Sequence, residues 1–137
     1  MPEFTPYPVE LITPEGIVFS GDAEKIVVNG AAGLLGILAN HAPLISLLEP
    51  GETRLTDADG TVRRYATDDG FVQVRKNHTL VLVGEAVPAD SIDASEAGRR
   101  LEEAKAALER AGEGGGDVYA ARREVGFAEA LVKTAAG

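Results

Sequence analysis

The sequence predicts an α+β protein, with an N-terminal β-sandwich followed by a C-terminal antiparallel helical hairpin. Up to about residue 87, short apolar segments alternate with turns rich in Gly, Pro and Asp, which is typical of a sandwich or flattened barrel. Beyond Pro88 the apolar residues recur every three or four positions, the period of one helix face. This change of period predicts a sandwich domain at 1–88 and a helical domain at 89–137.

The first domain is expected to contain about nine or ten short strands. Tyr7–Leu11 alternates apolar and polar residues, and Pro6 and Pro8 place it at a sheet edge or at the start of a strand. A turn is expected at Ser20-Gly21-Asp22, between the second and third strands. The strands after the first are expected at 17–19, 24–28, 34–38, 45–48, 53–56, 61–66, 71–74 and 79–83.

Two turns in this domain carry strong glycine signals. The segment 57–60 ends on Gly, as in a type I turn closed by a bulge, so the strands on either side of it form a hairpin. The segment 30–36 has three glycines, which predicts a tight turn carried into a bulged strand. Pro43 then interrupts regular structure and leaves Asn40 and His41 on a loop.

The helical domain is predicted to hold two helices of about 18 residues each. Asp93 caps the first helix, with Glu96 reaching back to it in a capping box. Four glycines within 112–116 are too costly to remain helical, so they end this helix, and Asp117 caps the second. The two helices meet along a seam of apolar positions: Ala94, Ala97, Leu101, Ala104, Leu108, Ala111, Val118, Ala121, Val125, Ala128 and Val132.

The seam leaves the strength of the hairpin open. Six of its eleven residues are Ala, which bury little area. Each fully buried Leu or Val contributes about 1.5–3 kcal/mol, and ordering the hairpin costs entropy of similar size. Two alternatives follow from the sequence: the hairpin is weakly held and can open, or it is static.

Composition argues against several classes of function. The formal net charge of −9 opposes binding to the phosphate backbone of nucleic acids. The chain has no Cys, which excludes disulfides, thiolate metal sites and Cys nucleophiles. No apolar run approaches the length of a membrane span, and the first residues resemble neither a secretory signal nor a transit peptide. We therefore expect a protein of the cytoplasm, or of the cytoplasmic side of a membrane complex.

No catalytic or metal site is expected. The two histidines, His41 and His78, both fall in turns, and the serines lack a nucleophile elbow. The segment 30–36 contains no Lys, which a phosphate-binding loop requires. Four aspartates fit turn chemistry better than a calcium loop, whose remaining ligands are missing: Asp57, Asp59, Asp68 and Asp69.

Five landmarks stand in order along the chain. They are Ser20-Gly21 before a strand, Gly36-Ile37-Leu38-x-x-His41-Ala42-Pro43-Leu44, Pro50-Gly51-x-x-Arg54, Gly70-Phe71-Val72-x-Val74, and Ile92-Asp93 at the start of an acidic helical tail. Their order and spacing resemble the epsilon subunit family of F-type ATP synthases. The resemblance covers roughly Val9 to Val132.

The resemblance implies a ten-stranded β-sandwich of two sheets in a non-catalytic subunit at the foot of a central rotor stalk. The sandwich would bind the gamma subunit and the c-ring, on the cytoplasmic face of the bacterial plasma membrane and without inserting into it. By position, the contact residues are Gly33, Leu34, Gly36, Asn40 and His41. The family often has Gly-Glu-x-Gly where this chain has Gly33-Leu34-Leu35-Gly36, so the usual acid is missing.

The same resemblance gives the hairpin a regulatory role. It would fold against the sandwich, or extend along gamma toward the alpha and beta subunits and inhibit ATP hydrolysis. Four arginines would then reach acidic segments of beta: Arg99, Arg100, Arg122 and Arg123. In the alternative, these charges only solvate the outer faces of the helices.

ATP is expected to bind weakly or not at all, and no cofactor is expected. Members of the family that bind ATP carry Ile-Asp-x-x-Arg-Ala, and Ile92-Asp93 matches the start of this motif. Glu96 stands where those members have Arg, and Arg99 and Arg100 lie one turn further on. A carboxylate at this place repels a nucleotide triphosphate.

Two other functions remain open at this point. The chain could be a free-standing regulatory module whose hairpin senses ATP, or a small hydrolase that uses His41 and a nearby Asp. A stable complex with gamma would distinguish the rotor-stalk subunit from both.

Overall fold

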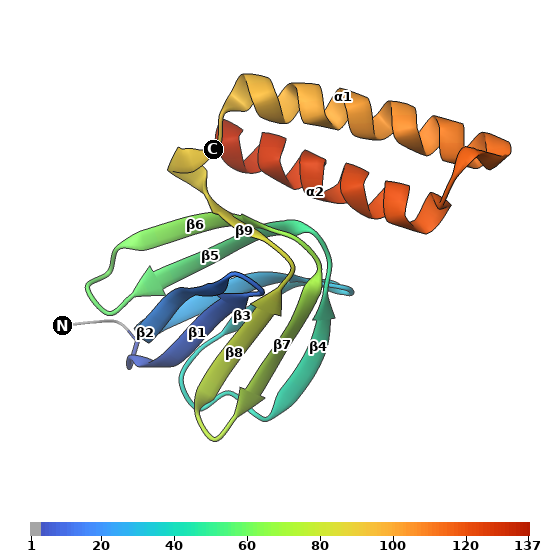
Figure 1. The fold of residues 1–137 in the computed structure, drawn as a ribbon. Coiled ribbons are helices and arrows are strands. Elements are labelled where there is room, and N and C mark those ends of the chain that lie inside the picture. Colours follow the sequence, from blue (N-terminus) through green and yellow to red (C-terminus); the bar gives the residue numbers. More distant parts are fainter. Residues whose placement is uncertain (1–3) are drawn as a thin grey trace.

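Nine strands and two long helices form the described part of the chain, residues 4–137 of the computed structural model (Figure 1). The strands are β1 (Tyr7–Thr13), β2 (Gly16–Gly30), β3 (Gly33–Ile37), β4 (Leu44–Leu48), β5 (Gly51–Asp57), β6 (Val62–Thr67), β7 (Gly70–Arg75), β8 (His78–Val83) and β9 (Ala86–Pro88). The helices are α1 (Ala94–Arg110) and α2 (Val118–Ala136), with a 3-10 turn at Ala89–Ser91 and a π-helical turn at Ala111–Gly115. The predicted α+β class is confirmed.

Strand β2 belongs to both layers of the sandwich. Its first half pairs with β1, and its second half pairs with β3 and β5. One layer is therefore β4-β7-β8-β1 with the start of β2, and the other is β3, the end of β2, β5, β6 and β9. Counted once in each layer, β2 brings the nine strands to the ten predicted.

The turn predicted at Ser20-Gly21-Asp22 is wrong. These residues continue β2 because β1 pairs with them, Glu10 opposite Ser20 and Pro8 opposite Asp22. The chain changes layer instead near Ala23, where the register between β2 and β5 shifts. Such an irregularity bends a strand without ending it.

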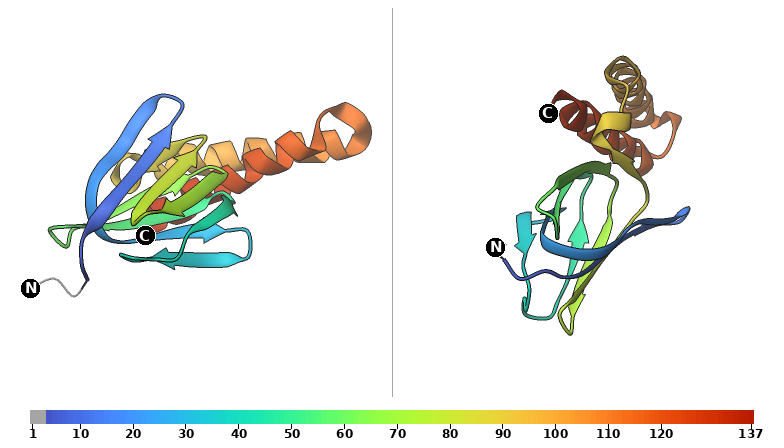
Figure 2. Two further views of the ribbon diagram at one scale, coloured as in Figure 1. Left: turned by 90° about the horizontal axis from the view of Figure 1, so that it is seen from below. Right: turned by 90° about the vertical axis from the view of Figure 1, so that its left-hand side faces the viewer.

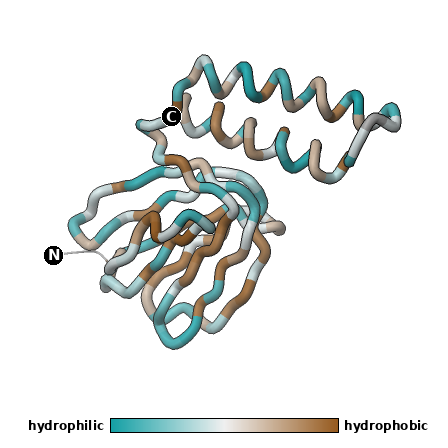
Figure 3. Tube along the Cα trace, in the orientation of Figure 1, coloured by the Kyte–Doolittle hydropathy of each residue, from teal (hydrophilic) through white to brown (hydrophobic). Residues whose placement is uncertain are grey.

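The core lies between the layers and follows the period of two. Alternate residues of β1, β7 and β8 are buried, and hydrophobic colour concentrates on the strands in Figure 3. The hydroxyl of Tyr7 donates a hydrogen bond of 2.7 Å to the carbonyl of Ile37, which ties β1 to β3. Strand β1 also pairs in parallel with β8, Val9 opposite Thr79, so the first strand is hydrogen-bonded on both sides.

Both predicted helix caps are confirmed. The Asp93 side chain accepts a hydrogen bond of 3.0 Å from the backbone N–H of Glu96, and Asp117 caps α2 through Ala120. The capping box is incomplete, because the Glu96 side chain pairs with Arg99 instead.

The glycines within 112–116 do not end the first helix at once. A π-helical turn follows α1, and the chain leaves it where Gly114 adopts a φ of 89°.

Helix α2 buries more apolar residues than the predicted seam contains. Ala128 of the seam is buried, and Phe127, Ala130 and Leu131, which lie outside it, form one cluster with Ala66 of β6 and Ala97 of α1. Helix α1 packs on α2, and α2 packs on β5 and β6 (Figure 1). The end of the hairpin that carries the glycine turn projects beyond the strands (Figure 2). Neither helix among the described residues is long and apolar enough to cross a membrane.

Candidate partner-binding surfaces

Gly33, Leu34 and Gly36 lie on the hairpin of β2 and β3. The turn is tight, and Gly33 adopts a φ of 127°, which explains the glycine there. The predicted bulge is absent, because β3 pairs with β2 in regular register from Gly30–Gly33 to Ile26–Ile37. Leu34 is 76% exposed, and a side chain at Gly36 would meet open space. This part of the predicted site is therefore an open apolar edge.

Asn40 and His41 belong to the segment 38–43 between β3 and β4. In Figure 1 this segment lies at the tip of the sandwich far from the helices. The backbone N–H of Asn40 donates a hydrogen bond of 2.6 Å to Oδ1 of Asn77, in the turn between β7 and β8. The Nδ1 atom of His41 lies 2.7 Å from the carbonyl oxygen of Ala42. The five predicted contact residues thus extend along one edge and do not form a single cluster.

The outer face of the sheet β4-β7-β8-β1 carries an apolar row that the sequence prediction missed. Ile12, Leu82, Phe71 and Leu47 stand directly opposite one another across four strands, and we call them the apolar row. Leu47 is 70% exposed and its neighbour on the same face, Ile45, is 73% exposed. The hairpin packs on the other layer and leaves this face uncovered (Figure 1). A contiguous apolar surface of this kind marks a binding site.

A sequence signal for the apolar row exists. Both β4 and β8 carry apolar residues at outward and inward positions alike, such as Leu47 and Leu48 in β4, or Leu82 and Val81 in β8. A strand that is apolar on both faces is typical of a sheet covered on both sides.

The apolar row continues into a groove of about 1560 Å³ between the sandwich and α2. Residues that line this groove include Leu34, Leu47, Phe71, Tyr119, Arg122 and Glu129.

The four hairpin arginines differ in their surroundings. Arg99 pairs with Glu96 at 2.8 Å, and Arg122 lines the groove. Arg100 donates to Glu124 across the two helices at 2.7 Å and lies over the ring of Phe127. The hydrogen bond from Arg100 to Glu124 raises the pKa of this arginine above its usual value. Of these three side chains, Arg100 therefore stabilises the pairing of α1 with α2.

Arg123 connects the hairpin to the sandwich. Its guanidinium lies 3.0 Å from Oδ1 of Asp69, at the start of β7, and the charge of Asp69 raises the pKa of Arg123. The neighbouring Asp68 has a different environment. Burial raises the pKa of its carboxyl above the usual value, and the charges of Asp69 and Glu124 act in the same direction.

Arg64 of β6 makes a second polar connection. Its guanidinium donates to Glu52 at 2.6 Å and to the backbone carbonyl of Thr134, in the last turn of α2, at 3.0 Å. Burial would raise the pKa of Glu52, but hydrogen bonds from Arg64 and Arg54 outweigh it and hold this pKa below its usual value. Glu52 thus orients the arginine that caps the carboxyl end of α2.

Ile92 and Asp93, which match the start of the nucleotide motif, have structural contacts in this fold. Ile92 packs against the cluster around Phe127, and Asp93 caps α1. Among residues 4–137, the four aspartates considered as a cation site belong to no group of three or more potential metal ligands. Asp57 accepts hydrogen bonds from the backbone N–H groups of Asp59 and Thr61, as expected of turn chemistry.

Comparisons with known proteins agree with this architecture. The model of a family described as the beta-sandwich domain of the ATP synthase delta/epsilon chain matches residues 7–89. The ATP synthase epsilon chain of Persephonella marina is 45% identical over 103 residues, which cover 75% of this chain and 76% of that one. The epsilon chain of Campylobacter fetus is 39% identical over 108 residues, covering 79% and 84%.

The fold also matches a solved structure, that of the Euglena gracilis mitochondrial ATP synthase containing OSCP, F1 and the c-ring. A chain of that assembly aligns with a TM-score of 0.79 at 22% identity, over 96% of this chain and 87% of that chain. The family match and the two epsilon-chain relatives together show that this chain belongs to the epsilon subunit family of F-type ATP synthases and is a non-catalytic subunit.

Proposed function

We propose that this chain is a component of the central rotor stalk whose sandwich binds the gamma subunit through the apolar row and the c-ring through the tip at Asn40 and His41. The single observation that supports the gamma contact best is the uncovered apolar row on the outer face of the sheet β4-β7-β8-β1. Burial of apolar side chains is the dominant favourable contribution to most protein–protein association. In this position the chain works at the membrane-facing end of the stalk, on the cytoplasmic side.

The hairpin is the regulatory element in this proposal. In the present structure it packs on β5 and β6, and the connections at Arg64 and Arg123 hold it there. Released from the sandwich, it would extend along gamma and inhibit ATP hydrolysis. The groove beside α2 supports this, because the contact between α2 and the sandwich is incomplete on that side.

Substitution within the apolar row tests the gamma contact. Leu47→Asp places a charge in the row, and we expect it to weaken binding to purified gamma at least tenfold in titration calorimetry, about 1.4 kcal/mol. The matched control is Val62→Asp, since Val62 is also exposed, at 51%, but lies on β6 away from the row. Equal affinity of the Leu47→Asp variant and the wild type would contradict the proposed gamma contact.

The c-ring contact requires a separate test. The His41→Glu variant should fold normally, because His41 bonds only to its own loop among the described residues. We expect this variant to retain gamma but to recover less c-ring when the complex is purified from membranes. Unchanged recovery of c-ring would remove His41 from the contact.

A further inference from the structure

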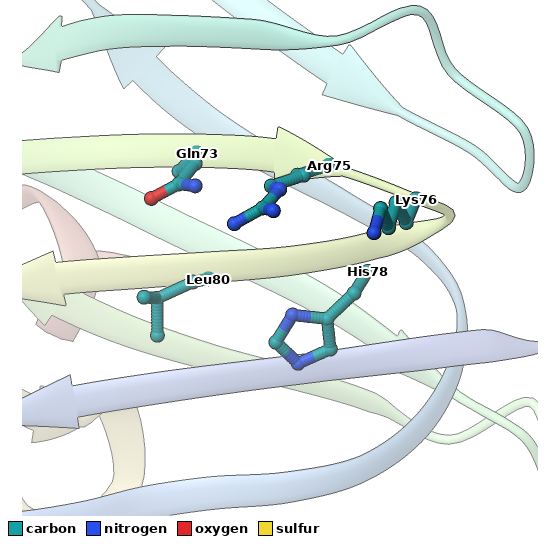
Figure 4. Close-up of a pocket in the computed structure, with 5 residues that line it drawn as sticks. All are labelled: Gln73, Arg75, Lys76, His78 and Leu80. Atoms are coloured by element: carbon teal, nitrogen blue, oxygen red, sulfur yellow. The ribbon is translucent and has the colours of Figure 1, made fainter.

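The outer face of β7 and β8 carries a second feature beside the apolar row. Arg75 and His78 stand opposite each other, with Gln73 and Leu80 opposite each other in the next outward positions. With Lys76 of the turn these side chains line a pocket of about 290 Å³, drawn in Figure 4. Arg, Lys and Gln together present ten N–H donors in their ordinary protonation states. The pocket is therefore built for an acceptor group.

The charge of this region is opposite to that of the whole chain. The net charge of the protein is −9, yet the turn 75–78 and the facing loop 38–43 contain no Asp or Glu. The nearby Glu10 lies 2.9 Å from the Nε2 atom of His78. Within the described residues, no carboxylate lies within salt-bridge distance of Arg75 or Lys76. Two cationic side chains are thus available to a partner.

The backbone that carries these cations is fixed in an uncommon conformation. The non-glycine residues with positive φ in the described chain are Asn40, Lys76 and Asn77, at 63°, 50° and 59°, and all three lie at this tip. Positive φ at both central residues is the requirement of a type I′ hairpin turn, and it favours Asn or Gly over Lys. The hydrogen bond between Asn40 and Asn77 ties the turn to the neighbouring loop. Lys76 is therefore locally unfavourable, a pattern that recurs at binding sites.

We infer that Arg75, Lys76 and Gln73 form a carboxylate-binding site that receives acidic side chains of the protein that covers the apolar row. This inference rests on the proposed function. The two surfaces are continuous, because Gln73 stands between Ile45 and Leu80 in the outward positions next to the apolar row. A partner seated on the row extends over the pocket, where the planar guanidinium of Arg75 suits a bidentate pair with a carboxylate.

An anionic membrane fits the pocket less well. Recognition of lipid headgroups by charge typically uses clusters of about four to eight Lys and Arg. This site has two fixed cations on a chain whose net charge of −9 is repelled by an anionic surface. Two cations held in one geometry match a small number of carboxylates on a folded protein better.

The first test is charge reversal. In the full chain, Arg75→Glu with Lys76→Glu should weaken binding to purified gamma at least tenfold at low salt and make the affinity less dependent on salt concentration. Lys105→Glu with Arg110→Glu, an equal change of charge on exposed positions of α1, is the matched control and should retain wild-type affinity. If affinity and salt dependence stay unchanged while Leu47→Asp still weakens binding at least tenfold, the carboxylate site is wrong and the proposed gamma contact stands. If neither the charge reversal nor Leu47→Asp weakens binding, the carboxylate site and the proposed gamma contact are both wrong.

The second test identifies the ligand group directly. A zero-length carbodiimide reagent joins an amine to a carboxylate that contacts it, so mass spectrometry should find Lys76 linked to an Asp or Glu of gamma. Lys76→Arg should keep the affinity and lose the cross-link. Cross-links from other lysines but none from Lys76 would overturn the inference. A second result would also overturn the inference. In it, the wild type sediments with vesicles of anionic phospholipid and the Arg75→Glu, Lys76→Glu variant does not, while both bind gamma with the same affinity.

Discussion

Gly126 of α2 lies directly against Pro50, in the turn between β4 and β5, so that a Cβ added to Gly126 would stand 3.3 Å from Cγ of Pro50. A glycine inside a helix costs about 1 kcal/mol relative to Ala. Here the glycine lets the helix approach the sandwich. The contact joins α2 to the turn between β4 and β5. In the same turn, the carbonyl of Pro50 accepts a hydrogen bond from the side chain of Asn29.

Two glycine substitutions test this contact. Gly98→Ala in α1, where a Cβ meets open space, should raise the free energy of unfolding by about 0.5–1 kcal/mol. Gly126→Ala should give no such gain, because the added methyl group presses on Pro50. Urea unfolding of both variants measures the difference. An equal gain at the two positions would show that the approach of α2 to Pro50 does not depend on the glycine.

Removing the charge of Asp68 and removing that of Asp69 should change the stability of the protein in opposite directions. Asp69→Asn removes the partner of Arg123 and should destabilise the docked hairpin by about 0.2–1 kcal/mol, the usual size for an exposed pair. Asp68→Asn removes a carboxylate whose pKa is raised by burial, and should raise the free energy of unfolding at pH 7. Hydrogen exchange of α2 and urea unfolding measure the two effects.

The pH dependence of the Asp68 effect has a definite sign. The pKa of Asp68 is higher in the folded protein than its unfolded value of 3.8, so folding favours the protonated carboxyl. Well below pH 3.8 the group is protonated in both states, and the ionised carboxylate then costs no folding stability. The cost grows as the pH rises through the folded pKa. The advantage of Asp68→Asn over the wild type should therefore appear between low and neutral pH. A constant advantage at all pH values would exclude this cause.

Removal of 90–137 should leave a folded sandwich. The main core cluster, which includes Val9, Ile26 and Val72, contains no residue of the hairpin. The truncated chain loses the cover over Ala66 and should melt at a lower temperature, but circular dichroism should keep its β signal. It should still assemble with gamma, and any inhibition of ATP hydrolysis should fall. Loss of the β signal would contradict the division into two domains.

ATP should bind with a dissociation constant above about 1 mM, which corresponds to roughly −4 kcal/mol. Glu96 pairs with Arg99 on the first turn of α1, so it both adds a negative charge and occupies the nearest cation. Glu96→Arg should strengthen binding, as measured by calorimetry at low salt. The control is Glu103→Arg, an equal change of charge on the exposed side of α1. Micromolar binding by the wild type would refute the expectation.

Local patterns predicted most of the fold. The periods of the two helices, their Asp caps and the hairpin at 57–60 each depend on residues close in sequence, and the structure has all of them. The path of β2 could not be predicted in this way. Whether Ser20-Gly21-Asp22 turns is decided by the pairing with β1, which a local turn signal does not contain.

The surfaces were harder to predict than the fold, for the same reason. Leu34 and His41 could be proposed together from the sequence because they belong to one short stretch of it. The apolar row combines Ile12, Leu82, Phe71 and Leu47, which become neighbours only through the register of four strands. Phe127 and Leu131 of α2 were missed because α2 has two neighbours, and these side chains cluster with Ala66 of the sandwich as well as with Ala97 of α1.

The position of β1 between β2 and β8 has a consequence for the order in which a growing chain folds. The first strand to be synthesised finds its second neighbour only when β8 has been made. Until then one edge of β1 has unpaired backbone groups, which is the kind of edge on which chains associate wrongly. The hairpin is synthesised later and meets a sandwich that is already closed. Nascent fragments should therefore become resistant to protease in one step, after Val83 has left the ribosome and before α2 exists.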